Sequence, residues 1–290
     1  MSSLKNLYIL PLIICLFVLG SCSNEDYLGG HYTAEGSGTL MHVTAQINAQ
    51  SDPTLVWSEG DVIGIAAGYG LYDATARNRE YKCQADGKTF SCTTEYPMYV
   101  KGTTQIVAYY PFVGMDGAEP ALSLNTKNQT DITDYLVAKS DVVTRETGDH
   151  VNLVFDYMLA RLQITITAPA GETIKSYRLS GFAQQAQVDP YTLDLTLDNP
   201  EDLVGTGDDI KTITLKLIPQ TVDTNSGVPA QLVLVGTSRS YTIDFSDIDL
   251  QAGSVQSAVI DVTDGIGTIE FLSSGATWTD SGIGGDVSSN

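Results

Sequence analysis

The side chains with the clearest covalent chemistry are the thiols of the cysteines. Cys22 follows Leu19 and the small-residue pair Gly20 and Ser21, the pattern that a lipoprotein signal peptidase recognises before an acylated cysteine. Two or more acyl chains attach a protein durably to a membrane, whereas a single chain binds only marginally. We therefore expect Cys22 to carry a lipid anchor. The alternative is an ordinary secretory signal in which Cys22 is incidental.

The residues before Cys22 have the pattern of an export signal. Lys5 supplies a positive charge, residues 7–19 form an apolar run, and Pro11 interrupts that run. A stable membrane-spanning helix needs about 20 apolar residues, so this run is too short to serve as an anchor. We expect residues 1–21 to be removed as a signal peptide. Residues 22–38, rich in Gly, Ser and acidic side chains, then form a flexible tether.

Cys83 and Cys92 flank a turn and could form a disulfide in an exported protein. A turn centred on Asp86 and Gly87 would set Cys83 opposite Phe90 and leave Cys92 at a diagonal distance of about 7–8 Å, too far for an unstrained bond. A turn shifted by one residue toward the C-terminus would set the two cysteines directly opposite each other. We expect this second register and a disulfide between Cys83 and Cys92, with two reduced thiols as the main alternative.

The sequence contains no side-chain constellation typical of an enzyme. It lacks a Gly-x-Ser-x-Gly elbow, a phosphate-binding glycine loop at the start of a helix, and a His-Glu-x-x-His zinc motif. The three histidines are His31, His42 and His150, and strand alternation places His42 on an outward face. A hydrolase built on His150 is the remaining enzymatic alternative. We expect no catalytic residues, no metal site and no cofactor.

The chain is strongly acidic, with a formal net charge of −20 over 290 residues. A field of that sign repels nucleic acids and anionic lipid head groups. We therefore expect no nucleic acid partner and interpret the acidity as a source of solubility on a crowded cell surface.

Beyond the tether, the chain alternates short β-branched or aromatic runs with turns rich in Gly, Asp, Asn and Pro, without a long helical period. In the first run, Met41, Val43, Ala45 and Ile47 fall on one face of a strand. The pattern predicts an all-β protein with a β-sandwich of about seven strands in each half. The expected strands cover residues 40–48, 61–66, 79–84, 88–92, 104–110, 134–138, 150–156, 161–168, 173–179, 191–197, 211–217, 230–235, 240–246 and 255–262.

The boundary between the halves is expected at residues 157–160, where a short sequence favours a helical turn between two strand patterns. A breakpoint at residues 169–171 is the alternative. We therefore assign residues 39–158 to an N-terminal domain and residues 159–263 to a C-terminal domain. Residues 264–290 are rich in Gly and Ser and contain one strand-like piece, so this tail is either an appended strand or partly disordered.

Five segments of the chain occur in a characteristic order: WSEGDVIGI at 57–65, AYYPF at 108–112, DYLVA at 134–138, VNLVFDYMLARL at 151–162 and LKLIPQT at 215–221. Together they resemble the fimbrillin family of Bacteroides-type bacteria, which includes the Mfa-like and FimA-like pilins. The resemblance covers residues 40–262, and its specificity comes from the order of the segments behind a lipoprotein signal. The acidic residues directly after Cys22 also resemble the surface-export tag of Bacteroides-type lipoproteins.

The resemblance implies two tandem transthyretin-like β-sandwich domains in a subunit of a surface fimbria or a related adhesive structure. Such subunits are exported as outer-membrane lipoproteins, and shaft subunits lose their first strand to a protease, so that a strand of the next subunit fills the groove by β-augmentation. Here Met41, Val43, Ala45 and Ile47 would plug that groove. The implied partners are other fimbrial subunits, the outer membrane through the N-terminal lipid, and a host protein or glycan.

Two departures from the family pattern are visible. The family often has His where Tyr157 stands, a position that we interpret as structural. In shaft subunits the cut follows an Arg near the end of the first strand, but no Arg or Lys lies between Cys22 and Arg77. Either another protease acts, or this subunit keeps its first strand and its lipid as an anchor or accessory subunit, which is the hypothesis we prefer. The alternative is a surface lipoprotein that binds a glycan or host protein alone.

Overall fold

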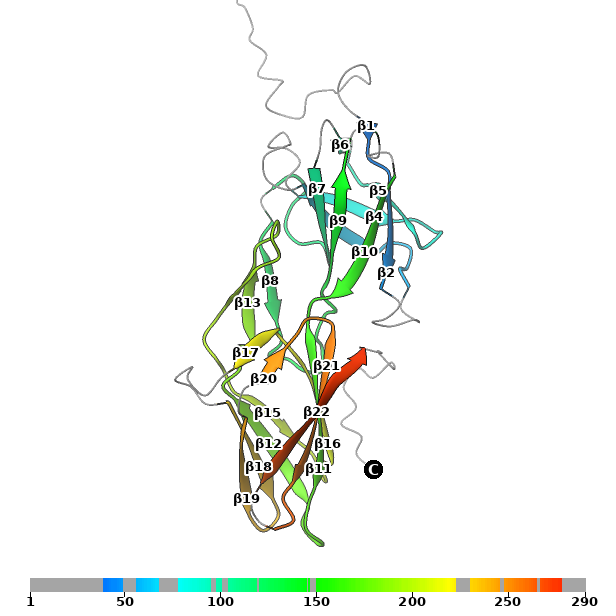
Figure 1. Cartoon of the computed structure of the whole chain (residues 1–290). Coiled ribbons are helices and arrows are strands. Elements are labelled where there is room, and N and C mark those ends of the chain that lie inside the picture. The colour runs from blue at the N-terminus through cyan, green and yellow to red at the C-terminus, as the bar shows by residue number, and fades with distance from the viewer. Residues whose placement is uncertain are drawn as a thin grey trace, which may run out of the picture. The chain divides into compact units, whose positions relative to one another are not determined.

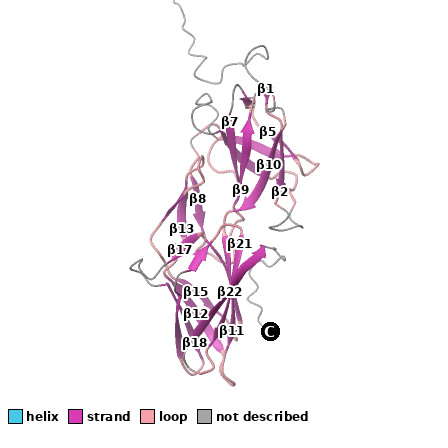
Figure 2. Ribbon diagram, viewed as in Figure 1, coloured by secondary structure: helices cyan, strands magenta, loops and turns pink. Residues whose placement is uncertain are grey.

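The structure is a computed structural model that describes residues 39–48, 56–67, 78–94, 98–100, 104–118, 120–144, 146, 150–222, 230–245, 248–264 and 267–277. All regular secondary structure in these residues is β-strand and none is helical (Figure 2). The prediction of an all-β protein is therefore confirmed. The expected signal peptide (1–21), the lipidation site Cys22 and the tether (22–38) lie outside the described residues.

The first half of the described chain forms a closed barrel of seven strands (Figure 1). In order around the wall the strands are β10 (Val151–Tyr157), β2 (Val43–Ile47), β5 (Thr89–Cys92), β4 (Arg79–Cys83), β3 (Val62–Ala67), β7 (Thr104–Tyr110) and β9 (Leu136–Val143). Inward side chains of these strands share one hydrophobic cluster. Trp57, just before β3, packs edge-on against the rings of Phe90, Tyr110 and Phe155, with ring centroids 5.1–5.3 Å apart.

A barrel replaces the sandwich that the alternation pattern predicts for this half. The pattern shows which side chains point inward, but it is the same for a sheet that closes on itself and for two sheets that face each other. Closure depends on β2, which pairs with β10 on one side and with β5 on the other. β2 thereby joins β5 and β10, which would otherwise be the two edge strands of a six-stranded sheet.

The second half is built from two four-stranded sheets around a second hydrophobic cluster, as expected for a sandwich. One sheet has the order β16 (Thr212–Leu217), β11 (Ala160–Thr167), β21 (Ser254–Asp261) and β22 (Thr268–Thr277). The other has the order β15 (Leu203–Thr206), β12 (Ile174–Ser180), β18 (Ala230–Gly236) and β19 (Ser240–Phe245). β22 pairs along β21 at the edge of its sheet, so the first part of the C-terminal tail is an appended strand (Figure 1).

A third sheet joins segments from the two halves. β8 (Leu122–Asn125), which lies between β7 and β9 in the chain, pairs with β13 (Gln185–Val188), and β13 also pairs with β14 (Leu195–Leu197). Two short pairs complete the structure, β1 (Thr39–Leu40) with β6 (Tyr99–Val100) and β17 (Gln220–Val222) with β20 (Ile248–Leu250).

The expected strands and the observed strands agree closely. Every expected segment overlaps a strand of the structure, whereas the short strands β6, β8, β13, β15, β17 and β20 were not expected. The helical turn expected at residues 157–160 is wrong. Met158 and Leu159 are buried with the barrel cluster, and Ala160 begins β11 in the second cluster, so the chain crosses between cores without a helix.

Candidate functional site

The candidate site is the seat of the first strand, the place in the barrel wall where β2 lies. β2 runs parallel to β10, with Val43 beside Val151 and Ile47 beside Phe155. On its other side β2 runs antiparallel to β5, where Val43 lies opposite Phe90. Two strands far away in the sequence therefore hold β2, and both of its backbone edges are engaged.

The inward side chains of β2, together with that of Met41 just before it, pack into the hydrophobic cluster of the barrel. Met41, Val43 and Ala45 are buried, with only 1–3% of their surface exposed. Ile47 is half-buried and packs against the same cluster. These are the four residues expected to plug a groove, and the structure brings them together on one face. Burying a large aliphatic side chain contributes about 1.5–3 kcal/mol, so β2 is a substantial part of the barrel core.

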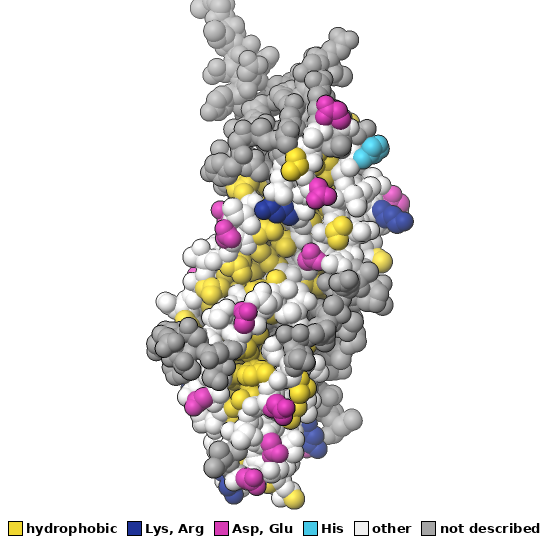
Figure 3. Space-filling model, in the orientation of Figure 1, with side chains coloured by type: hydrophobic (Ala, Val, Ile, Leu, Met, Phe, Trp, Pro, Cys, Tyr) yellow, Lys and Arg dark blue, Asp and Glu magenta, His cyan; other side chains and the backbone are white. Residues whose placement is uncertain are grey.

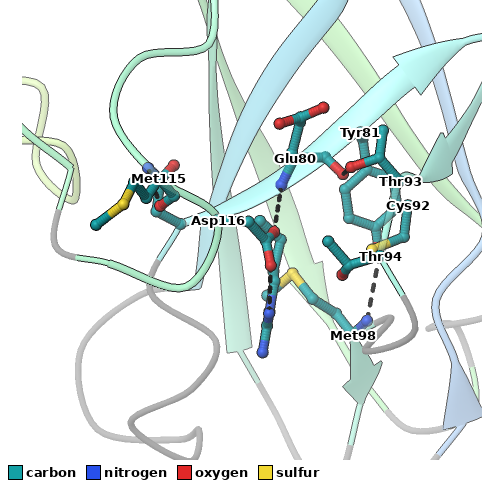
Figure 4. A network of polar contacts seen from close by, with 10 residues as sticks. Glu80, Tyr81, Cys92, Thr93, Thr94, Met98, Met115 and Asp116 are labelled. Atoms are coloured by element: carbon teal, nitrogen blue, oxygen red, sulfur yellow. Dashed lines mark hydrogen bonds and ion pairs between the residues drawn. The ribbon is translucent and has the colours of Figure 1, made fainter.

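A short polar relay ties the chain just before β2 to the barrel. The amide of Met41 donates to the carbonyl of Met98 at 2.9 Å, next to the β1–β6 pair. The amide of Met98 donates in turn to the hydroxyl of Tyr81, on the inward face of β4, at 3.3 Å (Figure 4). The N-terminal end of the seat is therefore held by hydrogen bonds as well as by apolar packing.

A second network fixes the loop after β7 to the start of β4 (Figure 4). Arg79 forms an ion pair with Asp116 at 2.7 Å, and its side chain keeps only 9% exposure. The other carboxylate oxygen of Asp116 accepts from the amide of Glu80 at 2.9 Å. The buried Asn78 donates to the carbonyl of Val113 at 3.0 Å. Because both ends of the ion pair are satisfied, it fixes the loop conformation.

The ionisable groups inside the seat are kept neutral. Burial raises the pKa of Tyr81, and its desolvation outweighs the hydrogen bond from Met98. Burial also raises the pKa of the Cys83 thiol, with a further contribution from the nearby carboxylates of Asp61, Asp86 and Glu59. A buried thiol whose pKa is raised is a poor nucleophile. The neutral forms of Tyr81 and Cys83 suit a site that works by strand pairing and packing.

The expected disulfide between Cys83 and Cys92 is absent, and the expected hairpin register is wrong. Cys83 lies opposite Phe90, so the turn is centred on Asp86 and Gly87 and Cys92 is diagonal to Cys83. The Asp86 carboxylate explains this register, because it accepts from the amides that follow Gly87, and Gly87 takes the positive φ of +64° that a tight turn needs. The Cys92 thiol lies 3.4 Å from the hydroxyl of Thr94.

On the face shown in Figure 3, the charged side chains of the described residues are spread out and form no single patch. Acidic side chains are scattered over the face shown in Figure 3 and lie between isolated basic ones. Within the described ranges, no group of three or more His, Cys, Asp or Glu side chains is arranged to hold a metal ion. In the same part of the chain, no helix is long and apolar enough to cross a bilayer.

Sequence reasoning missed two carboxamides near the β8–β13 pair, those of the half-buried Gln129 and the buried Gln220. The side chain of Gln129 pairs with both backbone groups of Lys216, donating to its carbonyl and accepting from its amide, each at 3.0 Å. In the same way, the side chain of Gln220 accepts from the amide of Ala183 at 2.9 Å and donates to its carbonyl at 3.1 Å. Lys216 also forms an ion pair with Asp134 at 2.6 Å. No spacing rule identifies such residues, because a glutamine reads as a surface side chain.

The chain is similar to proteins of fimbriae and of cell adhesion. A family model described as fimbrillin-like matches residues 45–278. A candidate cell adhesion protein from Bacteroides ovatus has 16% identity and a TM-score of 0.61, with 83% of this chain and 98% of that chain covered. A second, from Bacteroides uniformis, has 19% identity and a TM-score of 0.58, with 85% and 100% covered.

The fold is also similar to that of a third solved structure. The tip fimbrial protein Mfa3 from Porphyromonas gingivalis has 9% identity and a TM-score of 0.52, with 81% of this chain and 98% of that chain covered. No curated protein sequence matches the chain. At such low identities the structural likeness extends to the fold alone, and the family assignment rests on the match to residues 45–278.

Proposed function

This chain belongs to the fimbrillin-like family and is a fimbrial subunit of the cell surface, and on that premise we propose that it is an anchor or accessory subunit that keeps its first strand. A shaft subunit must present an empty groove to its neighbour. An anchor or accessory subunit can keep the groove filled from within its own chain.

One observation carries the proposal: the position that a neighbour's strand would take is already occupied. β2 is paired on both sides, and Met41, Val43 and Ala45 are buried in the barrel. A strand from another subunit can enter only after β2 leaves, because backbone groups that are already paired offer no edge for β-augmentation. The absence of Arg and Lys between Cys22 and Arg77 supports the same proposal, since an arginine-specific protease has no target there.

The remaining parts of the proposal concern attachment and partners. The lipid on Cys22 holds the chain to the outer membrane, and residues 22–38 span the distance to the barrel. The partners are a host protein or glycan and other fimbrial subunits, with which this chain takes part in strand complementation as the donor of a strand and not as the acceptor. The fold supplies no enzymatic step in this proposal.

We also propose a division into two domains near residue 159. Its support is the pair of hydrophobic clusters: Leu159 is the last residue before the boundary in the first cluster, and Ala160 begins the second. Four residues of the second half nevertheless belong to the first cluster, namely Ala186, Val188, Ile218 and Val255. We propose the transthyretin-like description for the second domain only, where two four-stranded sheets enclose one core.

The decisive experiment is the N-terminal sequence of the protein recovered from native fimbriae. We expect an acylated Cys22 at the N-terminus. A protein that begins downstream of Gln50 would overturn the proposal and place the chain among the polymerising shaft subunits, with residues 39–48 as a removable plug.

Two matched variants separate attachment from strand retention. Cys22→Ala should move the protein out of the membrane fraction and leave its fold unchanged. Deletion of residues 39–48 should destabilise the barrel and turn a monomeric protein into one that self-associates. Detergent partitioning that is unchanged in Cys22→Ala would contradict the lipid anchor. A deletion variant that stays monomeric and stable would contradict the plug.

A further inference from the structure

The outer face of the β2–β10 pair carries a row of side chains that follows directly from the register. Val43 lies beside Val151 and Ala45 beside Leu153, with all four side chains directed into the barrel. Because side chains alternate along a strand, the intervening residues form rungs on the outer face. These rungs are His42 with His150, Thr44 with Asn152, Gln46 with Val154, and Asn48 with Asp156.

Two of these rungs show that side chains in the same rung reach each other. The hydroxyl of Thr44 donates to the side-chain oxygen of Asn152 at 3.2 Å. The amide of Asn48 donates to the carboxylate of Asp156 at 2.6 Å. The spacing on this face therefore allows direct contact across the two strands.

The first rung consists of two of the three histidines in the chain. The amide of Val151 donates to the carbonyl of His42 at 2.9 Å, which keeps the strands in register at this point. Both His42 and His150 are exposed. Neighbouring strands lie about 4.7–4.9 Å apart, so two imidazoles in one rung can turn toward a common ion at the usual zinc–nitrogen distance of about 2.0–2.1 Å.

We propose that His42 and His150 together bind one divalent transition-metal ion of the kind that prefers imidazole, with Zn²⁺ and Cu²⁺ as the best fits. Water completes the coordination sphere. The described residues contain no cluster of three metal-ligating side chains, so this is a two-ligand site of moderate affinity. The residues that form it come from strands 108 positions apart, as the neighbouring rung does.

A metal ion at this position would also hold the first strand in its seat. His42 directly precedes β2 and His150 directly precedes β10, so a bound ion would clip β2 to the strand beside it. This consequence rests on the proposed role of β2, whereas metal binding itself does not. An ion that binds only the paired state, present at ten times its Kd, lowers the equilibrium constant for strand release by about elevenfold.

The test uses the mature chain from Cys22 to Asn290 without a histidine tag. Zn²⁺ binding is measured by calorimetry, and Cu²⁺ by the nitrogen hyperfine pattern of its electron paramagnetic resonance spectrum. We expect one site per chain with two nitrogen ligands. His42→Gln and His150→Gln should each weaken Zn²⁺ binding at least about tenfold, and the double variant should abolish it. His31→Gln is the matched control, because it removes the third histidine and should leave binding unchanged.

The results that would overturn the site are equally specific. Zn²⁺ affinity that survives in His42→Gln, or that disappears in a Cys83→Ser/Cys92→Ser variant, would assign the ion to other ligands. For the clip, hydrogen exchange at the amides of residues 43–47 should slow about tenfold with Zn²⁺ at ten times its Kd. Exchange that is unchanged by saturating Zn²⁺ would overturn the clip. A processed N-terminus in fimbriae would overturn only the proposed function, since metal binding is measured on the uncleaved chain.

Discussion

The ring of Tyr109 lies directly against the α-carbon of Gly64 on the neighbouring barrel strand. The two residues are paired in the β3–β7 ladder, and a Cβ added at Gly64 would collide with the ring and hydroxyl of Tyr109. The ring is held in place because its hydroxyl donates to the side-chain oxygen of Asn78 at 2.8 Å, with the carbonyl of Val113 a second acceptor 3.2 Å away. The aromatic ring thus covers backbone that glycine leaves bare.

Gly64→Ala should therefore destabilise the barrel. Overpacking of this kind costs about 1–3 kcal/mol, and the fully buried Tyr109 has no room to move. Gly205→Ala is the matched comparison, since Tyr177 covers Gly205 in the same way but is only partly buried and can shift. Urea denaturation should show a larger loss for Gly64→Ala. Equal losses would contradict the role of the anchored hydroxyl.

The carboxamide of Gln129 gives the second prediction. It donates to the carbonyl of Lys216 and accepts from its amide, the two hydrogen bonds that a neighbouring strand would otherwise make. In Gln129→Glu the donor becomes an acceptor that faces the Lys216 carbonyl, and such an unsatisfied contact costs about 1–3 kcal/mol. We expect a lower midpoint in urea denaturation and faster exchange of the Lys216 amide.

Asn128→Asp is the control for Gln129→Glu. It introduces the same charge one residue away, at an exposed position. The side-chain oxygen of Asn128 accepts from the hydroxyl of Thr130 at 2.8 Å, and a carboxylate oxygen can accept the same bond. Its stability should stay close to that of the wild-type protein. A loss equal to that of Gln129→Glu would mean that added charge, and not the lost donor, causes the effect.

Local patterns in the sequence were sufficient to predict much of the strand content and the inward face of β2. The alternation of Met41, Val43 and Ala45 is a property of one short segment, and burial follows it directly. Closure of the barrel could not be predicted in this way. It depends on the pairing of β2 with a strand 108 residues away, and no local period records that partner.

Other parts of the site depended on single polar side chains. The hairpin register follows from the Asp86 carboxylate, which holds the turn, and not from the spacing of the cysteines. The buried Asn78 and Gln220 and the half-buried Gln129 organise loops and strand edges, but each reads as a surface residue in the sequence. Tertiary packing decides whether such a side chain is buried, and its partners are backbone groups that carry no sequence signal.

The Asp86 turn predicts a pH dependence. Hydrogen bonds from the hydroxyl and amide of Thr89 and from the amide of Lys88 lower the pKa of Asp86 to about 2. The unfolded chain has the higher, ordinary pKa of about 3.9, so the stabilising contribution of the ionised carboxylate is complete above that value and is lost as pH falls through about 2. Carboxyl-carbon NMR should find the Asp86 midpoint near 2.

Thr89→Val tests the cause of that low pKa. It removes the hydroxyl, which is the largest contribution, so the pKa of Asp86 should move up toward its ordinary value. Asp86→Asn should remove the acid-dependent step in hairpin stability between about pH 4 and pH 2. An Asp86 midpoint near 4 in the wild-type protein would contradict the hydrogen bonds of the turn.

The packing of β2 gives the last prediction, which compares two adjacent residues with opposite orientations. Val43 points into the barrel with 1% exposure, whereas Thr44 points outward. Val43→Ala removes two methyl groups from a closed core and should cost about 2 kcal/mol, the transfer of those groups plus a small cavity. Thr44→Ala removes only an exposed contact and should stay within about 0.5 kcal/mol of the wild-type value. Both should be measured by urea denaturation of the uncleaved mature chain. If the two variants lose the same stability, β2 is not an integral part of the barrel, and a strand held so loosely could leave its seat for a neighbour without proteolysis.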